Sequence, residues 1–339
     1  MPRALIVGAA GQDGSYLAEL LLARGWEVHG LVLPRQVDDC PRLKSVRERV
    51  RLHAGDVSDQ AAVDAAVERS APDHVYNLAS QSFMPTSWDD PVRTGDVAGL
   101  GAARLLEALR RLAPKARFYQ SSSAELFGLP ERAPQDERTP LAPRSPYAAA
   151  KVYAHHLVNA YRERYGLFAV SGIAFNHESP RRGPSFVTRR VTSGAAAVKL
   201  GLAKTLALGD LDARRDWGYA GDFVEAMFRT LDAEKPGDFV LATGETRSVR
   251  ELAETAFAAV GLDWREHVVA DASRRRPPEP VERRGDPAKA RRLLGWSPRV
   301  GFRALVEGMV RWDLECLRAG RPDAVDAPAG AVSPSAPGA

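Results

Sequence analysis

The sequence predicts an α/β protein with a doubly wound parallel sheet and a smaller C-terminal lobe. Three observations support this fold class: short apolar segments alternate with amphipathic helical segments, a glycine turn follows the first apolar segment, and the alternation stops near residue 175. Strands separated by helices are joined by parallel crossovers, which build a doubly wound sheet. With 339 residues, the chain is long enough for two lobes that share a cleft.

The predicted strands and helices alternate in a regular order. Residues 3–8 (RALIVG) are a short apolar run that predicts a buried strand directly before the glycine turn. The other predicted strands cover residues 26–33, 48–57, 72–80 and 116–123. The predicted helices between them cover residues 15–25, 60–70 and 101–112. We therefore expect neighbouring strands to pair in parallel.

The pattern changes after this region, where the sequence becomes irregular and rich in Pro, Gly and Arg. We expect residues 1–175 to form the sheet domain and residues 208–242 to return to it. Residues 176–207 and 243–318 would then form the smaller lobe. The tail, residues 319–339, has too little apolar content to fold and is predicted to be disordered.

Composition argues against several classes of protein. No apolar run approaches the roughly 20 residues of a membrane-spanning helix, and the first residues lack the order of a signal peptide. Two cysteines cannot build a disulfide framework or a cysteine zinc site, so we expect no metal and a cytoplasmic location. The net charge is +4, and the basic clusters at 179–190 and 272–292 hold almost no aromatic residues, which argues against a nucleic-acid partner. Clustered arginines suit an anionic small ligand such as a diphosphate.

The glycine turn GAAGQDG places Gly8, Gly11 and Gly14 between the first strand and the first helix. Glycines let the backbone approach a pyrophosphate, and the helix N-terminus stabilises its charge. This turn at the start of a βαβ unit predicts a Rossmann-type dinucleotide site. The second strand ends without the acidic residue that binds a free ribose 2′-hydroxyl, and Arg35 lies there instead. We therefore expect NADP, with NAD as the alternative.

Polar residues follow the later predicted strands. Asp56, after the third strand, can accept a hydrogen bond from an adenine amine, and the segment 77–82 (NLASQS) follows the fourth. The fifth strand leads to Ser123 and Glu125. Because ligands bind at the carboxyl edge of open α/β sheets, we expect all these side chains near one site.

The stretch SPYAAAKVY, residues 145–153, predicts a helix on which Tyr147 and Lys151 share one face. An ordinary amphipathic helix would also carry this pattern. Beside a nucleotide site, however, an ammonium and a nicotinamide cation favour phenolate and lower the pKa of the tyrosine, which can then act as a base. Ser123 can bond the reacting substrate oxygen at the same edge.

Taken together, these motifs resemble the extended short-chain dehydrogenase/reductase superfamily. More narrowly, the chain is similar to the GDP-mannose 4,6-dehydratase family from about residue 3 to about residue 318. The segments that carry this similarity are GQDGSYLAELL, SSSAELFG, PRSPYAAAK, FNHESPRRG, DARRDWGYAGDFV and GDPAKARRLLGW.

The resemblance implies a lyase that converts GDP-mannose, or a close GDP-sugar, to the GDP-4-keto-6-deoxy sugar through bound NADP. Its catalytic residues would be Ser123, Glu125, Tyr147 and Lys151. A dehydratase must remove the C5 proton and expel the C6 hydroxyl, which requires a carboxyl group such as Glu125. The alternatives are a C4 reductase or epimerase of a GDP-hexose or GDP-heptose, and a catalytically silent cofactor-binding protein.

The resemblance also implies the binding residues and the partners. Cofactor contacts would come from Gly8, Gly11, Gln12, Asp13, Gly14, Arg35, Asp56, Val57, Leu78, Ala79, Ser80, Tyr147, Lys151, His177 and Arg182. The nucleotide-sugar would contact Ser82, Asn176, Arg182, Val187, Arg190, Gly209, Arg215, Arg276 and Glu279. We expect a homodimer and leave a tetramer open. The chain departs from the family pattern in Ser123 for threonine, Arg190 for lysine, Tyr219 for histidine, and a shorter loop after the second strand.

Overall fold

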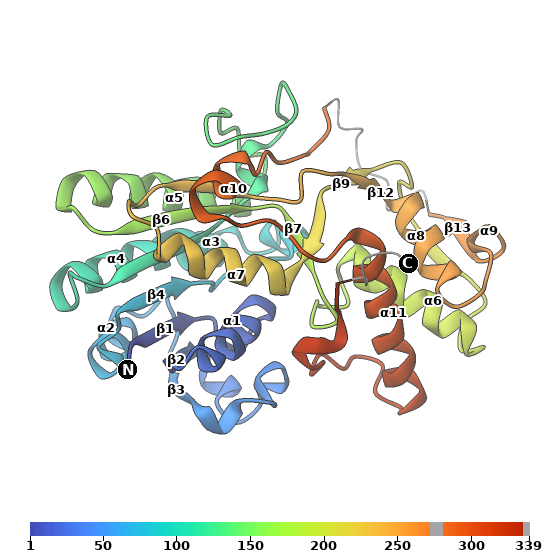
Figure 1. Ribbon diagram of the computed structural model, residues 1–339, viewed down its shortest axis with the longest axis horizontal. Coiled ribbons are helices and arrows are strands. Elements are labelled where there is room, and N and C mark those ends of the chain that lie inside the picture. The colour runs from blue at the N-terminus through green and yellow to red at the C-terminus, as the bar shows by residue number, and fades with distance from the viewer. Residues whose placement is uncertain (272–280, 335–339) are drawn as a thin grey trace.

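The computed structural model describes residues 1–271 and 281–334 (Figure 1). Within these residues, a seven-stranded parallel sheet has the order β11-β6-β5-β4-β1-β2-β3. Its strands are β1 (Arg3–Val7), β2 (Glu27–Val32), β3 (Val50–Ala54), β4 (His74–Asn77), β5 (Arg117–Ser123), β6 (Ala169–Ala174) and β11 (Asp238–Leu241). The strand order reverses between β1 and β4, and ligands of open α/β sheets bind at such a reversal.

Helices cover both faces of the sheet. The residues of β1 alternate between two apolar cores: Ala4 and Ile6 enter one, and Leu5 and Val7 enter the other. Burial on both faces is why β1 is a nearly continuous apolar run. The helices of the first core are α1 (Gln12–Ala23) and α7 (Ala220–Leu231), and those of the second are α2 (Gln60–Ser70), α4 (Gly101–Leu112) and α5 (Pro146–Tyr165).

The predicted fold class is confirmed. Each of the five predicted strand ranges contains a strand, and the three predicted helices correspond to α1, α2 and α4. The short helix α3 (Pro91–Gly95) continues through a π-helical turn, Asp96–Leu100, into α4. The loop after β2 forms short 3₁₀ turns at Pro34–Gln36, Pro41–Leu43 and Arg47–Arg49.

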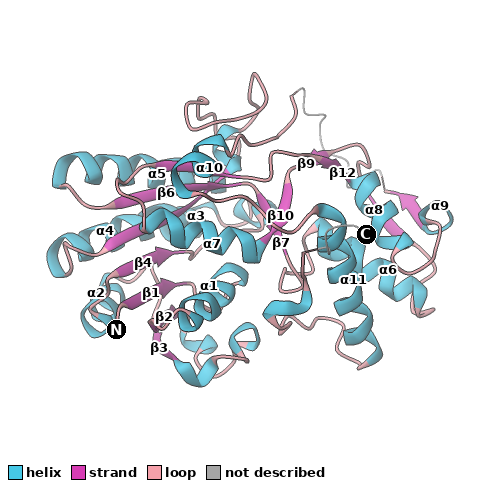
Figure 2. Cartoon of the chain, in the orientation of Figure 1, coloured by secondary structure: helices cyan, strands magenta, loops and turns pink. Residues whose placement is uncertain are grey.

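The smaller lobe has its own apolar cluster, which includes Val191, Leu252, Phe257 and Val310. Its helices are α6 (Val187–Lys199), α8 (Val249–Ala258), α9 (Trp264–His267) and α11 (Phe302–Arg318). The short strands outside the main sheet pair as β7 (Asn176–Glu178) with β10 (Trp217–Tyr219), β9 (Arg214–Arg215) with β12 (Arg247–Ser248), and β8 (Leu206–Leu208) with β13 (Val268–Ala270). Figure 2 shows the pairs β7–β10 and β9–β12 beside the main sheet. The helix α10 (Ala288–Leu294) packs near β11. We keep the predicted domain boundaries as a proposal, which this separate cluster supports.

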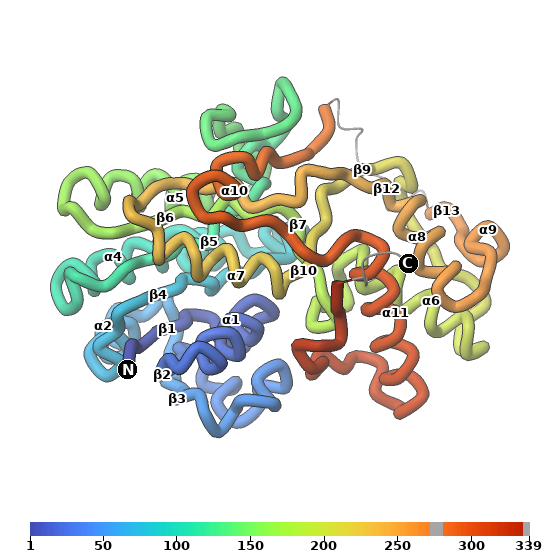
Figure 3. Tube along the Cα trace, in the orientation of Figure 1, coloured from blue at the N-terminus to red at the C-terminus, as the bar shows by residue number. Residues whose placement is uncertain are grey.

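The C-terminal segment differs from the predicted disordered tail. Residues 319–334 run back along the body of the protein, as the dark red end of the tube in Figure 3 shows. The Arg181 Nε donates to the Ala327 carbonyl at 2.8 Å, and the Tyr219 hydroxyl donates to the Ala329 carbonyl at 2.9 Å. Ala327 and Val332 are buried. Low apolar content predicted disorder, but donors from distant elements satisfy the backbone of this segment.

Across the parts of the chain that the structure describes, no helix combines the length and the apolar character that crossing a membrane requires. The same residues contain no group of three or more His, Cys, Asp or Glu side chains that could hold a metal ion.

Candidate active site

The carboxyl ends of the central strands and the smaller lobe line one cleft of about 670 Å³. Residues 8–14 form one part of its wall, and residues 121–125 at the end of β5 form another. Most of the predicted site residues line this cleft: Gly8, Gly11, Gln12, Asp13, Gly14, Leu78, Ser80, Ser82, Ser123, Glu125, Tyr147, Lys151, Asn176, His177, Arg182, Val187, Arg190, Gly209 and Arg215.

Several predicted residues lie elsewhere. Arg35 is exposed in the first 3₁₀ turn after β2. Asp56 accepts hydrogen bonds from Ser58 at 2.9 Å and from Arg93; burial opposes its ionisation, but these bonds lower its pKa. Val57 and Ala79 do not line the cleft, although the Ala79 backbone packs against Gly8. Arg276 and Glu279 lie outside the described residues.

The glycine turn brings the backbone of β1, α1 and the segment after β4 into close contact. Gly8 has φ +88°, which side chains rarely allow, and a Cβ there would lie 2.9 Å from the Ala79 nitrogen. A Cβ on Gly14 would lie 2.4 Å from the Gly8 carbonyl oxygen and 2.7 Å from the Ala9 Cα. The turn therefore exposes bare backbone to the cleft at the N-terminus of α1, as a pyrophosphate site requires.

A polar network joins this turn to the smaller lobe. The Gln12 Nε2 donates to the His177 carbonyl at 3.1 Å, and the Ser179 hydroxyl donates to the Gln12 Oε1 at 2.8 Å. The His177 Nε2 lies 2.9 Å from an Asp13 carboxylate oxygen, and its Nδ1 lies 2.7 Å from the Phe175 carbonyl. Although burial opposes both charges, their attraction raises the pKa of His177 and lowers that of Asp13. A short Asp13–His177 contact thus joins the glycine turn to β7.

The Tyr147–Lys151 pair lies at the start of α5. The Ser145 side chain caps this helix by accepting from the Ala148 N–H, and Pro146 occupies its first turn. Both side chains are buried; the Lys151 Nζ donates to the Ser121 carbonyl at 2.7 Å and lies 5.7 Å from the centre of the Tyr147 ring. The predicted shared helix face is present.

The predicted effect of this pair on the tyrosine is wrong for the protein alone. Burial raises the pKa of Tyr147 to about 12, and the negative charge of Glu125 adds to this, while Ser123, Arg182 and Ser80 oppose it. Burial also lowers the pKa of Lys151 to about 8. Desolvation is the largest cause of both shifts, because the fold removes most solvent from these two side chains.

Glu125 lies in the 3₁₀ turn Ala124–Phe127, directly after β5, where its backbone N–H donates to the Ser123 Oγ at 3.2 Å. Its carboxylate pairs with Arg283, whose Nη1 lies 2.9 Å from the Glu125 Oε1. Sequence analysis missed Arg283, because it is one of many arginines in the basic cluster at 272–292.

Arginines line the opposite part of the cleft. The Arg182 guanidinium lies 3.5 Å from the centre of the Phe186 ring and 3.1 Å from Glu178. Arg190 and Arg215 also line the cleft, and the Arg215 Nη1 donates to the Arg214 carbonyl at 2.6 Å. These cations suit an anionic ligand such as a diphosphate.

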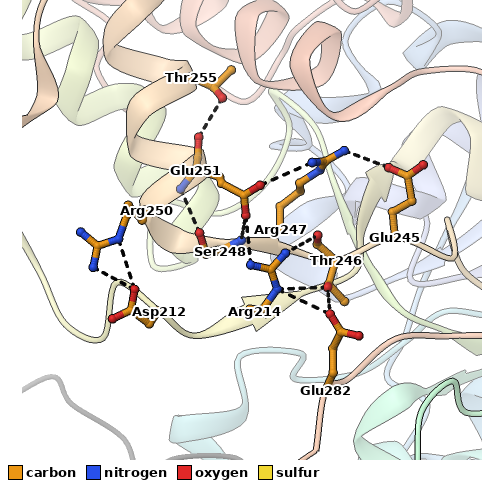
Figure 4. A network of polar contacts seen from close by, with 10 residues as sticks. All are labelled: Asp212, Arg214, Glu245, Thr246, Arg247, Ser248, Arg250, Glu251, Thr255 and Glu282. Atoms are coloured by element: carbon orange, nitrogen blue, oxygen red, sulfur yellow. Dashed lines mark hydrogen bonds and ion pairs between the residues drawn. The ribbon is translucent and has the colours of Figure 1, made fainter.

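Figure 4 shows the polar network beside these arginines, where Arg214 connects α8 with the segment that holds Glu282. Arg214 lies 3.3 Å from Glu251 and 3.5 Å from Glu282. Glu251 also accepts from the Ser248 N–H at 2.7 Å, and Asp212 pairs with Arg250 at 2.8 Å. The network connects β12 to β9, whose residues Arg214 and Arg215 line the cleft.

Known proteins resemble this chain over nearly its whole length. A family model described as GDP-mannose 4,6 dehydratase matches residues 5–309. GDP-mannose 4,6 dehydratase 1 of Arabidopsis thaliana is 45% identical over 327 residues, which cover 93% of this chain and 90% of the relative. The GDP-mannose 4,6 dehydratase of Homo sapiens is 43% identical over 342 residues, covering 93% and 92%.

Solved structures share the fold. RMD from Pseudomonas aeruginosa complexed with NADPH has a TM-score of 0.80 at 26% identity, covering 92% of this chain and 99% of that one. The UDP-glucose 4-epimerase of Thermus thermophilus, in complex with NAD, has a TM-score of 0.80 at 31% identity, covering 91% and 98%.

Proposed function

The chain belongs to the GDP-mannose 4,6-dehydratase family, and from this premise we propose that it converts GDP-mannose to the GDP-4-keto-6-deoxy sugar by internal hydride transfer and loss of water. It is an enzyme of the hydro-lyase class. One observation carries the proposal: Glu125 lies in the same cleft as Ser123, Tyr147 and Lys151. A C4 reductase or epimerase needs only the last three, and the relatives do not favour that alternative.

The described residues fit a nicotinamide dinucleotide. The bare backbone of the glycine turn at the N-terminus of α1 suits its pyrophosphate, and the structural relatives bind NADPH or NAD. We propose NADP, because the exposed Arg35 lies in the turn after β2, and the end of this strand carries no acidic residue to bind a free ribose 2′-hydroxyl. The proposed cofactor residues remain those named from the resemblance, with Tyr147 and Lys151 at the nicotinamide end. When bound, the cofactor supplies a hydride acceptor and a positive charge.

The first half of the reaction needs a base at C4. Tyr147 takes the proton of the C4 hydroxyl, and Ser123 bonds the same oxygen. Because burial raises the pKa of Tyr147 to about 12, its phenolate depends on positive charge brought into the cleft. Lys151, with its pKa lowered to about 8, is held toward the site by the Ser121 carbonyl and supplies part of that charge.

The second half needs a group that both accepts and donates a proton. The C4 ketone acidifies the C5 hydrogen, and Glu125 removes it. Glu125 then protonates the departing C6 hydroxyl, which leaves as water while the electrons of the C5–H bond form a C5=C6 double bond. The hydride taken from C4 and a proton then add to C6 and C5, which gives the 4-keto-6-deoxy sugar. The diphosphate of the substrate lies, in this proposal, near Arg182, Arg190 and Arg215, which line the same cleft.

We also propose a cytoplasmic homodimer. Val92 is 81% exposed and Tyr153 is 46% exposed on the neighbouring elements α3 and α5, which supports an apolar interface there. The cytoplasmic location is supported by the composition, in which both cysteines are free. A tetramer remains an alternative.

The test is incubation of the purified protein with GDP-mannose and with other nucleotide-sugars, followed by mass spectrometry. Loss of one water from GDP-mannose, with no net use of cofactor, is the expected result. On this C4 alcohol a C4 reductase could run only in the oxidising direction, removing two hydrogens and consuming oxidised dinucleotide, and an epimerase would leave the mass unchanged, so either result would contradict the proposal. Titration with both dinucleotides compares NADP with NAD; tighter binding of NAD would remove the role given to Arg35.

A further inference from the structure

Glu125 is paired with a cation that none of the sequence motifs contains. The Arg283 Nη1 lies 2.9 Å from the Glu125 Oε1, and the two side chains are 15% and 29% exposed. The residues are 158 positions apart in the sequence, and both line the cleft. A charge-assisted bond of this length in a partly enclosed site is stronger than a surface ion pair.

The backbone on both sides of Arg283 is clamped. The buried Gln135 donates its Nε2 to the Glu282 carbonyl at 3.1 Å and accepts the Arg284 N–H on its Oε1 at 3.0 Å. Its own N–H donates to the Arg284 carbonyl at 2.7 Å. The fold therefore ties the segment before α5 to the segment that presents Arg283.

A second clamp comes from Asp216, which is fully buried next to β10. Its carboxylate accepts the Gly285 N–H at 3.3 Å, and it also accepts the N–H groups of Thr243 at 2.9 Å and Gly244 at 3.0 Å. Arg283 thus extends from a main chain that is fixed on both sides, so its guanidinium has a defined position relative to Glu125. A fixed guanidinium can select one oxygen of a carboxylate.

The cleft that Glu125 lines also holds the charged or titratable side chains of Asp13, Tyr147, Lys151, His177, Glu178, Arg182, Arg190, Asp210, Asp212, Arg214, Arg215, Glu282 and Arg283. After burial, the negative charge of Glu125 is one of the causes that raise the pKa of Tyr147. Glu125 therefore carries its charge close to the group that starts the reaction. Among the described residues, Arg283 forms an ion pair with the Glu125 carboxylate.

We propose that Arg283 positions Glu125 for proton transfer by occupying its Oε1, so that Oε2 carries the proton from C5 to the departing C6 oxygen. This inference rests on the proposed dehydration. In that step the C5–H bond breaks and its proton moves to Oε2; the C6–O bond then breaks as the same proton moves to that oxygen, which leaves as water. Arg283 keeps its own protons throughout, since a guanidinium stays charged at all working pH values.

The test compares Arg283→Gln, Arg283→Lys and wild type in the conversion of GDP-mannose. We expect Arg283→Gln to lower kcat for water loss roughly 10- to 100-fold, as removal of a charged hydrogen-bond partner from a catalytic acid–base does, with KM nearly unchanged. Arg283→Lys should recover part of this loss, because it restores the charge but not the planar geometry.

Arg284→Gln is the matched control. Arg284 shares the same clamped backbone, but its side chain pairs with Glu282 at 3.3 Å and does not line the cleft. It should keep wild-type kcat. The melting temperature and the bound cofactor of each variant show whether it is folded.

A double variant tests whether Arg283 acts through Glu125. In a Glu125→Gln background, Arg283→Gln should lower kcat for water loss less than about twofold further, because its target is already gone. If Arg283→Gln lowers kcat for water loss as much in the Glu125→Gln background as in wild type, or if it raises KM alone, Arg283 binds the substrate directly and the inference is overturned. If wild type loses water from GDP-mannose and Arg283→Gln does so at the same rate, the inference about Arg283 is overturned while the proposed function stays intact. Absence of water loss in wild type would overturn both.

Discussion

Glu125 and Tyr147 line one cleft but act on different protons in the proposed reaction. Glu125→Gln should still bind GDP-mannose and allow some C4 oxidation, yet lose dehydration by a factor of about 100 or more, because no other group replaces its proton transfers. Tyr147→Phe should block the first hydride transfer instead. Cofactor absorbance follows the first step and mass spectrometry follows water loss. Near-normal water loss in Glu125→Gln would remove this residue from the chemistry.

The partly buried Asp13–His177 pair predicts a pH-dependent stability at the residue scale. Asp13→Asn keeps a hydrogen-bonding side chain but removes the charge, and should lower the free energy of unfolding by about 1–3 kcal/mol. Because the pKa of His177 is raised, its contribution to the free energy of unfolding is complete below about pH 6.5 and is lost as the pH rises further. Because the pKa of Asp13 is lowered, its contribution to the free energy of unfolding is present above about pH 4. Urea unfolding at several pH values should therefore show the largest difference between about pH 4 and 6.5. Asp89→Asn, at an exposed position, is the control, and a pH-independent difference would contradict the charged pair.

At the scale of elements, the packing of α1 on the glycine turn leaves no room at Gly14. A Cβ there would lie 2.4 Å from the Gly8 carbonyl oxygen, and backbone atoms cannot move aside as a flexible side chain can. Gly14→Ala should therefore destabilise the protein by about 1–3 kcal/mol and weaken dinucleotide binding about tenfold or more. Thermal unfolding and cofactor titration measure the two effects. Gly95→Ala is the control, because a Cβ at Gly95 meets nothing within 4 Å, and it should change neither stability nor dinucleotide binding. Equal effects in both variants would exclude the backbone clash at Gly14 as the cause.

At the scale of the whole molecule, the C-terminal segment connects elements far apart in the sequence. Arg181 and Arg189 donate to the carbonyls of Ala327 and Ala324 at 2.8 and 2.9 Å, and both arginines lie on the segment that carries Arg182 into the cleft. Deleting residues 319–339 should lower stability by about 3 kcal/mol or more, since two buried guanidinium groups lose acceptors. It should also raise KM for GDP-mannose. Deleting only residues 335–339 removes no described contact and is the control; an unchanged melting temperature in the longer deletion would support the disordered tail predicted from composition.

Local sequence was enough for the architecture. The strands of the main sheet are apolar runs bounded by turns, and the glycine turn and the Tyr147–Lys151 spacing depend on residues within two helical turns. These features are set by side-chain periodicity and backbone freedom, which act over a few residues. They predicted the fold class, the dinucleotide end of the cleft and the pairing of a phenol with an ammonium.

Only the tertiary structure decided the partners of these groups and their ionisation. Arg283 meets Glu125 across 158 residues, and Gln12 meets His177 across 165. Nothing in the basic cluster at 272–292 distinguishes Arg283 from its neighbours, because a side chain becomes a partner only where the packed backbone presents it. The rise in the pKa of Tyr147 has the same origin, since desolvation depends on what the fold places around the phenol. Sequence thus determined which groups this protein brings to the cleft, and packing determined which partners they meet there and how far they are removed from solvent.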